Sequence, residues 1–196
     1  SLEHMTHIRP YINGNYMMLD HATRRNLELV ETLREKQKRG SLLWVLDKTK
    51  TAMGARTLRS YIEQPLNDYD EIIRRHKAIE EINRQMITRE ELREYLNPIY
   101  DLERIMTKVI YQTANPRDLL AFKTSIAMLP PIKSLLADYR GDLLRQICED
   151  LDPLEDLHAL IDASISEDPP ISVRDGDIIK DGYSEDIDHY RDAKTK

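Results

Sequence analysis

The sequence is poor in the residues that build disulfides, multi-cysteine metal centres and tight β-turns. Its 196 residues include one cysteine, Cys148, and six glycines. A single cysteine excludes a disulfide within the chain and a zinc site made of several cysteines. The scarcity of glycine, together with many Leu, Ile, Glu, Arg and Lys residues, favours helices over a sheet of many short strands.

Long apolar runs are also missing. The run from Leu42 to Leu46 is far shorter than the roughly 20 residues with which a helix crosses a bilayer. The N-terminus has no apolar core of a signal peptide. We therefore expect a soluble, cytoplasmic protein that does not contact a membrane.

The motifs of common catalytic sites are absent as well. The sequence contains no GxxxxGK[ST] phosphate loop, GxGxxG turn, HExxH helix or GxSxG elbow. His4 and His7 could share a helix face, but no cysteine or third histidine stands near them, so we expect no metal site. His76 falls on an apolar stripe, which favours a histidine at the edge of the core over a catalytic base. We predict no catalytic, cofactor-binding or metal-binding residue and no enzymatic activity.

Charge is distributed unevenly along the chain. Residues 1–66 carry 11 Lys/Arg and 7 Asp/Glu, whereas residues 145–196 carry 6 Lys/Arg and 15 Asp/Glu. Because cationic side chains drive affinity for nucleic acids, the acidic last quarter is not a general phosphate-binding surface. Any contact with nucleic acid is expected in the first third, although a solvated basic surface is the simpler interpretation of its Lys and Arg residues.

One stretch, residues 46–66, has clear signals for both ends of a helix. Thr51 predicts its start, since a threonine hydroxyl can accept a hydrogen bond from an amide of the first turn. Pro65 predicts its end, because proline lacks an amide donor and disfavours helical geometry in the residue before it. Ala52, Gly54 and Ala55 are small and would let a neighbouring helix come close. Such a stretch suits a helix that is held rigidly against its neighbours.

Similar start signals recur along the chain. Asn115 followed by Pro116 predicts a helix from the proline onward, because proline pre-sets the first turn. Four further positions are predicted to cap helices: Thr23, for a helix that includes Leu33; Asp68; Thr88, in a capping box with Glu91; and Asp152.

Several charged residues stand at helix starts or beside apolar faces. They are Asp101, Arg104 and Arg117, with Arg56 in the 46–66 stretch. An arginine offers a planar fork of donors to a carboxylate. We expect at least one of these arginines to form an ion pair that fixes one helix against another.

β-Structure is expected in two places only. The segment 171–183 has β-branched residues on both sides of Asp175-Gly176, which predicts a hairpin turning there. A short strand is also an option at residues 16–19. The predicted fold is therefore mainly α, a helical bundle with a small β-hairpin near the C-terminus.

Five segments, in order, resemble the core or lever domain of the MutS family of DNA mismatch-recognition proteins. Two of them, YMMLDHATRRNLEL and GSLLWVLDKTKTAMGARTLRSYIEQPL, cover residues 16–29 and 40–66. The others are YDLERI, ANPRDLLAFKTSIAMLP and DPPISVRDGDIIKDGYSEDIDHYR, at residues 100–105, 114–130 and 168–191. Two departures are Tyr61, where the family often has tryptophan, and Asp177, where it more often has glycine.

The resemblance implies that residues 1–196 form a single core-domain fragment that ends where the clamp begins. The mismatch-binding, connector, clamp and ATPase domains would lie outside it. The implied role is mechanical: a lever that couples ATP binding and hydrolysis to the binding of mismatched DNA. ATP and magnesium would belong to the parent protein. The implied partners, all through the parent, are mismatched double-stranded DNA, a second MutS subunit and MutL.

An alternative from another class is a free-standing helical module that binds a partner protein through its acidic end. The reading frame around residues 1–196 distinguishes the two hypotheses, because only the first requires a phosphate loop downstream.

Overall fold

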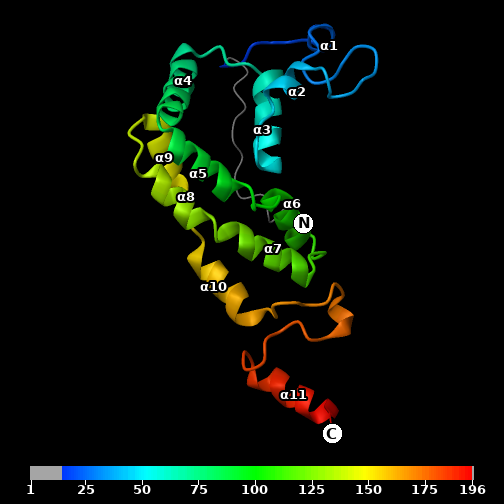
Figure 1. Cartoon of the computed structure of the whole chain (residues 1–196). Helices are drawn as coiled ribbons and strands as arrows, with labels where there is room; N and C mark the ends of the chain where they lie inside the picture. Colours follow the sequence, from blue (N-terminus) through cyan, green and yellow to red (C-terminus); the bar gives the residue numbers. More distant parts are fainter. Residues whose placement is uncertain (1–14, 196) are drawn as a thin grey trace. The chain divides into compact units, whose positions relative to one another are not determined.

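The computed structural model describes residues 15–195, which divide into two compact units. The first unit comprises residues 15–49 and Ala55–Lys77, and the second comprises Lys50–Gly54 and residues 78–195. Helices dominate both (Figure 1). The elements are α1 (His21–Asn26), α2 (Leu42–Leu46), α3 (Ala52–Glu63), α4 (Tyr69–Arg84), α5 (Met86–Leu96), α6 (Leu102–Ile110), α7 (Pro116–Ile126), α8 (Leu129–Leu136), α9 (Asp142–Asp150), α10 (Glu155–Ser164), the 3-10 helix η2 (Val173–Asp175) and α11 (Glu185–Thr195).

In the first unit, helix α1 is shorter than predicted. The carboxylate of Asp20, not the hydroxyl of Thr23, caps it, accepting a hydrogen bond from Thr23 N at 2.6 Å. The helix ends before Leu27, and Glu28 then takes a left-handed conformation with φ of 48°. The prediction of a helix that includes Leu33 was wrong, because this turn brings the chain back toward α2. There Leu43 N donates to Leu29 O at 2.9 Å, and both leucines are buried.

Residues 16–19, where a short strand was a possible prediction, form only a single β-bridge. Tyr16 forms an isolated antiparallel bridge with Leu66, and Met17 N donates to Pro65 O at 2.7 Å. Within the described residues no sheet is present, so the β-character of this segment is limited to one pairing with the chain that follows α3.

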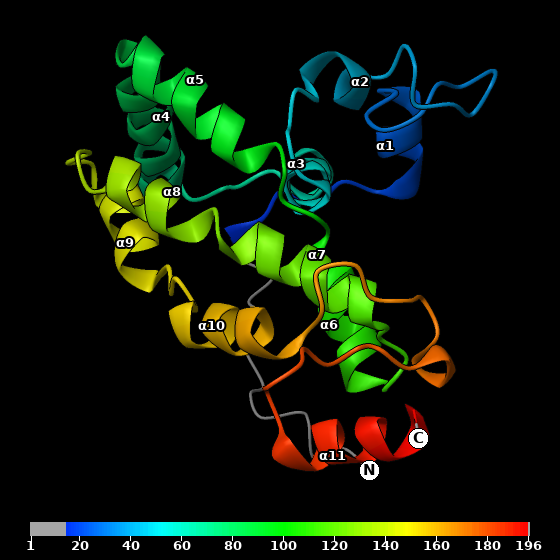
Figure 2. The same ribbon diagram turned by 60° about the horizontal axis from the view of Figure 1, so that its bottom comes forward.

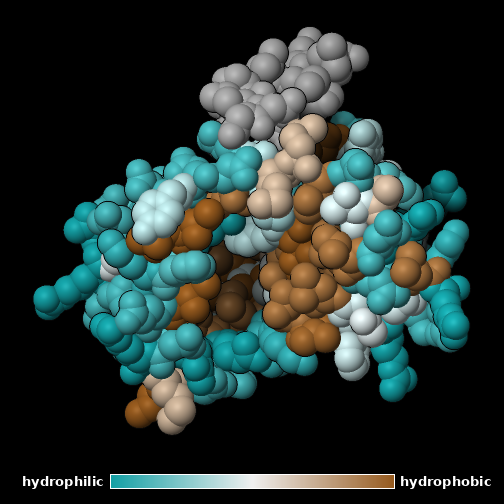
Figure 3. Space-filling model, turned by 90° about the horizontal axis from the view of Figure 1, so that it is seen from above, coloured by the Kyte–Doolittle hydropathy of each residue, from teal (hydrophilic) through white to brown (hydrophobic). Residues whose placement is uncertain are grey.

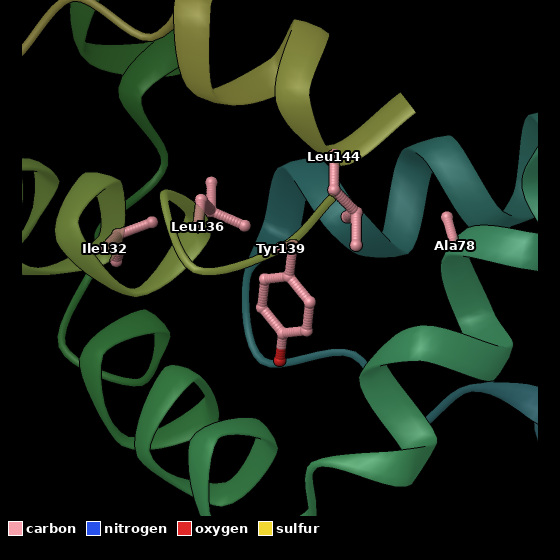
Figure 4. Close-up of a cluster of buried hydrophobic side chains, with 5 residues drawn as sticks. All are labelled: Ala78, Ile132, Leu136, Tyr139 and Leu144. Carbon is pink, nitrogen blue, oxygen red and sulfur yellow. The ribbon is translucent and has the colours of Figure 1, made fainter. Parts of the chain in front are cut away.

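The second unit has two apolar clusters, each built from several helices. Figure 2 shows the helices that contribute to them, α5 to α10. In the first, helices α5 and α9 pack on α8, and the end of α4 adds a buried alanine. The buried members of this cluster, drawn in Figure 4, are Ala78, Ile132, Leu136, Tyr139 and Leu144. In the second, α7 packs between α6 and α10, and the buried members are Ile105, Phe122, Ile126, Ile161 and Ile165.

Residues Pro116–Leu136, which cover α7 and α8, are apolar and long enough to cross a membrane by length and composition alone. A single such stretch is weak evidence for a membrane span, because a core helix of a soluble protein passes the same test. Here the two helices supply Phe122 and Ile126 to one apolar cluster and Ile132 and Leu136 to the other. They therefore have a place in the core of the second unit.

The predicted hairpin at Asp175-Gly176 does not form. Residues Val173–Asp175 make the short helix η2, and the β-contact is an isolated bridge between Ile165 and Ile179. Ser166 N donates to Ile178 O, and Lys180 N donates to Ser164 O, each at 2.8 Å. The segment thus pairs with the exit of α10 rather than with itself. The reason is tertiary, because Ile178 and Ile179 pack against the cluster around Phe122.

Three further local predictions were wrong. Thr88 lies inside α5, whose first residue is Met86, so it caps nothing. Helix α10 begins only at Glu155, and Asp152 instead accepts a hydrogen bond from Leu154 N at 2.9 Å. His76 is exposed rather than at the edge of the core, since α4 buries Ala78 instead.

Apolar side chains also reach the surface among hydrophilic ones, as one face of the molecule shows (Figure 3). On α2 the exposed members are Leu42, Trp44, Val45 and Leu46, and on α6 they are Met106, Val109 and Ile110.

Candidate functional site: the capped helix joints

The start of α3 is fixed by a local contact, and its end falls just before the proline. Thr51 Oγ1 accepts a hydrogen bond from Gly54 N at 3.0 Å, the geometry of a helix cap. The helix ends at Glu63, two residues before Pro65. Arg56 is exposed on this helix, and Gly54 is half-buried. A close approach of another helix at Gly54 stays a prediction.

The joint between α6 and α7 is held by a reciprocal cap. Asn115 Oδ1 accepts a hydrogen bond from Asp118 N at 2.9 Å, and Asp118 Oδ2 accepts one from Asn115 N at 3.0 Å. Pro116 occupies the first helical position. The sequence predicted the asparagine and the proline, while the structure adds the aspartate that completes the capping box.

Asp118 also ties α7 to α6. Its Oδ1 accepts from Lys108 Nζ of α6 at 2.7 Å, and both side chains are partly buried. Burial raises the pKa of Asp118, but the Asn115 amide, the Lys108 ammonium and the nearby charge of Arg104 together lower it below its ordinary value. The expected ion pair of Arg104 between helices stays a prediction. Asp101 caps α6, accepting from Arg104 N at 3.2 Å.

Arg117 connects the start of α7 to a distant loop. Its Nε donates to Pro169 O at 3.1 Å, and a terminal nitrogen lies 3.7 Å from a carboxylate oxygen of Asp168. Asp168 is 98% exposed, so water screens this ion pair and it contributes little. The hydrogen bond to Pro169, a buried residue, is the stronger link. Arg117 thus fixes a helix to a loop rather than to another helix.

Three residues that sequence reasoning missed fix other helices. Ser125 of α7 is completely buried, donates to Ala121 O at 2.8 Å and accepts from Tyr100 N at 2.9 Å. Glu81 of α4 accepts from Arg140 N at 2.7 Å and from Gly141 N at 2.9 Å. Lys133 of α8 donates to Leu151 O at 2.6 Å. Only the fold could reveal these contacts, because the partners of Glu81 lie about 60 residues away in sequence.

The described residues give no sign of a metal centre. Among residues 15–195, no group of three or more His, Cys, Asp or Glu side chains is placed to hold a metal ion. His4 and His7 lie outside this range. What the structure brings together is a set of helix caps and contacts between helices.

Capped helices that are tied to one another define an all-helical structural domain, and comparison with known proteins identifies its family. The family described as MutS domain III matches residues 22–194. The chain therefore belongs to the MutS family, and it is this family's domain III.

Relatives agree along the whole chain. It is 62% identical over all its 196 residues to a DNA mismatch repair protein MutS of Lachnoclostridium phytofermentans, covering 21% of that protein. It is 49% identical to a protein of the same name from Acetivibrio thermocellus, with 98% of the chain and 22% of that protein covered. Against the MutS of Ruminiclostridium cellulolyticum, the identity is 48%, with 100% of the chain and 22% of the relative covered. The chain thus spans about a fifth of the length of the curated relatives it matches.

Proposed function

We propose that this domain is the lever of a MutS protein, carrying conformational change between the site that binds ATP and the part that grips mismatched DNA. The domain itself performs no chemistry. The observation that carries the proposal is the joint between α6 and α7, where Asn115, Asp118 and Lys108 tie two helices through hydrogen bonds and an ion pair.

Rigidity matters in a lever because the free energy that it transmits is small. An allosteric coupling is typically about 1–3 kcal/mol. The loss of one helix cap costs about 1 kcal/mol. A joint that lost its cap could therefore absorb much of the free energy that links the two sites. The caps of α3, α6 and α7 support this role.

The remaining partners belong to the proposal for the whole protein. ATP and magnesium would bind to other domains of the parent, in the cytoplasm. Mismatched double-stranded DNA, a second MutS subunit and MutL would be its macromolecular partners. The family membership of the chain supports these assignments.

The test uses the full-length parent protein with Gly54→Leu. We expect the substitution to reduce the effect of ATP on mismatch affinity, because a larger side chain disturbs α3 near its capped start. Affinities for nucleotide alone and for mismatched DNA alone should change less than this coupling does. The matched control is Ser60→Leu, which adds an apolar side chain at an exposed position of the same helix. Unchanged coupling in a normally folded Gly54→Leu protein would contradict the proposal.

A further inference from the structure

The turn between α8 and α9 is held by a carboxylate from another helix. The two oxygens of Glu81 accept hydrogen bonds from two consecutive amides, Arg140 N at 2.7 Å and Gly141 N at 2.9 Å. Gly141 is the residue that precedes α9, so a negative charge sits at the positive end of this helix. Charge-assisted hydrogen bonds of this kind are stronger than neutral ones.

The fit between Glu81 and Gly141 is tight. A Cβ atom at position 141 would lie 2.6 Å from Glu81 Oε2, closer than real Cβ contacts come. Any side chain there would move the carboxylate. The atom in the way is the end of a flexible side chain, so moving the carboxylate would make room for a side chain at position 141, and the φ of −62° is open to any residue.

The C-terminal end of α9 is held by a hydrogen bond from another helix. Lys133 Nζ of α8 donates to Leu151 O, just beyond the last residue of the helix, at 2.6 Å. A positive charge thus faces the negative end of the helix. Because α9 is also held by the bond from Lys133 and by the packing of Leu144 in the apolar cluster, releasing the bonds of Glu81 would leave the rest of the helix attached.

The same turn buries a polar group that has no partner. Tyr139 is 2% exposed, and in Figure 4 Leu136 and Leu144 lie on either side of the backbone end of its side chain. Among the described residues, its hydroxyl is one of two buried side-chain groups without a hydrogen bond. Burial raises the pKa of Tyr139, and the charge of Glu81 raises it further. Leaving such a hydroxyl unpaired opposes the closed turn, because water would satisfy it if the turn opened.

We propose that Glu81 is a latch that holds the turn between α8 and α9 closed against the unsatisfied hydroxyl of Tyr139. When the latch opens, the turn loosens at Arg140 and Gly141 and Tyr139 gains access to water, while the end of α9 near Leu151 stays bound to Lys133. The latch is a conformational device of this chain. It goes beyond the lever function and does not depend on it.

Hydrogen exchange of backbone amides, measured by NMR on the chain, tests the latch. In Glu81→Gln we expect exchange at Arg140 and Gly141 to rise roughly ten- to a hundredfold, because the carboxylate bonds weaken. Exchange at Leu151, at the tied end of α9, should stay the same. Gly141→Ala, which keeps the charge but displaces the carboxylate, should raise exchange at Arg140 in the same direction.

Tyr139→Phe separates a latch from a static cap. Removing the unsatisfied hydroxyl should slow exchange at Arg140 and Gly141 roughly three- to tenfold relative to the unchanged chain. The matched control is Glu80→Gln, because Glu80 is exposed on the same helix and pairs with Arg84. Amides of α7, such as Phe122, report whether each variant is folded.

Two results would overturn the proposal. One is unchanged exchange at Arg140 and Gly141 in a folded Glu81→Gln chain. The other is exchange at Arg140 and Gly141 in Tyr139→Phe that is equal to or faster than in the unchanged chain. In a static cap the unpaired hydroxyl would not favour opening of the turn, so removing it would not slow exchange.

Discussion

Asn115 and Asp118 cap each other: the side chain of each accepts a hydrogen bond from the backbone amide of the other, at 2.9 and 3.0 Å. Asp118 is paired with Lys108 of α6 as well. One carboxylate therefore serves both the start of α7 and its contact with α6, which makes this joint the most informative place to disturb the domain.

The lowered pKa of Asp118 predicts how stability depends on pH. Its carboxylate stabilises the fold above the ordinary aspartate pKa, and this contribution is lost as the pH falls through the lower pKa of the folded state. Asp118→Asn should reduce the free energy of unfolding at pH 7 by about 1 kcal/mol. It should also flatten the fall in stability below about pH 4. Urea unfolding at pH 7 and pH 3 measures both effects.

The charge-matched control for this prediction is Glu94→Gln, on the exposed surface of α5. Equal losses in the two variants at pH 7 would mean that the capping box contributes nothing beyond general charge.

Gln112 offers a stabilising substitution. It follows the end of α6 with φ of 55°, and Thr113 N donates to Lys108 O at 2.8 Å while Gln112 N donates to Val109 O at 3.0 Å. This is the Schellman ending of a helix, which usually has glycine at the left-handed position. Gln112→Gly should therefore raise the free energy of unfolding by about 1 kcal/mol. Thermal unfolding measures the gain, and Gln112→Ala, which keeps the strain, should show none.

Ser125 predicts a loss of stability from a small change. Its buried hydroxyl accepts a hydrogen bond from Tyr100 N at 2.9 Å. Ser125→Ala leaves this amide without its partner and should lower the free energy of unfolding by about 1–3 kcal/mol. Thr124→Ala, at an exposed position of the same helix, is the comparison and should cost clearly less. Similar losses at both positions would argue against a special role for the buried hydroxyl.

The sequence predicted features that depend on neighbours within one helical turn. Thr51 and Asn115 cap helices through amides three residues away, so their signals are local. The hairpin prediction at Asp175-Gly176 was wrong because a distant apolar cluster binds Ile178 and Ile179 and pairs the chain with the exit of α10. Tertiary packing there outweighed a local turn preference.

No local sequence pattern could predict the contacts between helices. Glu81 looks like one more acid on the polar face of α4, and nothing near it in sequence names Gly141 as its partner. Ser125 likewise reads as a minor polar residue in an apolar helix. Their roles follow from which helices the fold brings together.

The most direct test of the lever is a distance across the joint between α6 and α7. Spin labels on exposed positions, Met106 of α6 and Thr124 of α7, would report it in the full-length parent diluted with unlabelled protein. A rigid joint gives one narrow distance distribution that is the same with and without ATP, and a broader one in Asp118→Asn. A distribution in the unmutated joint that shifts or broadens when ATP binds would contradict it.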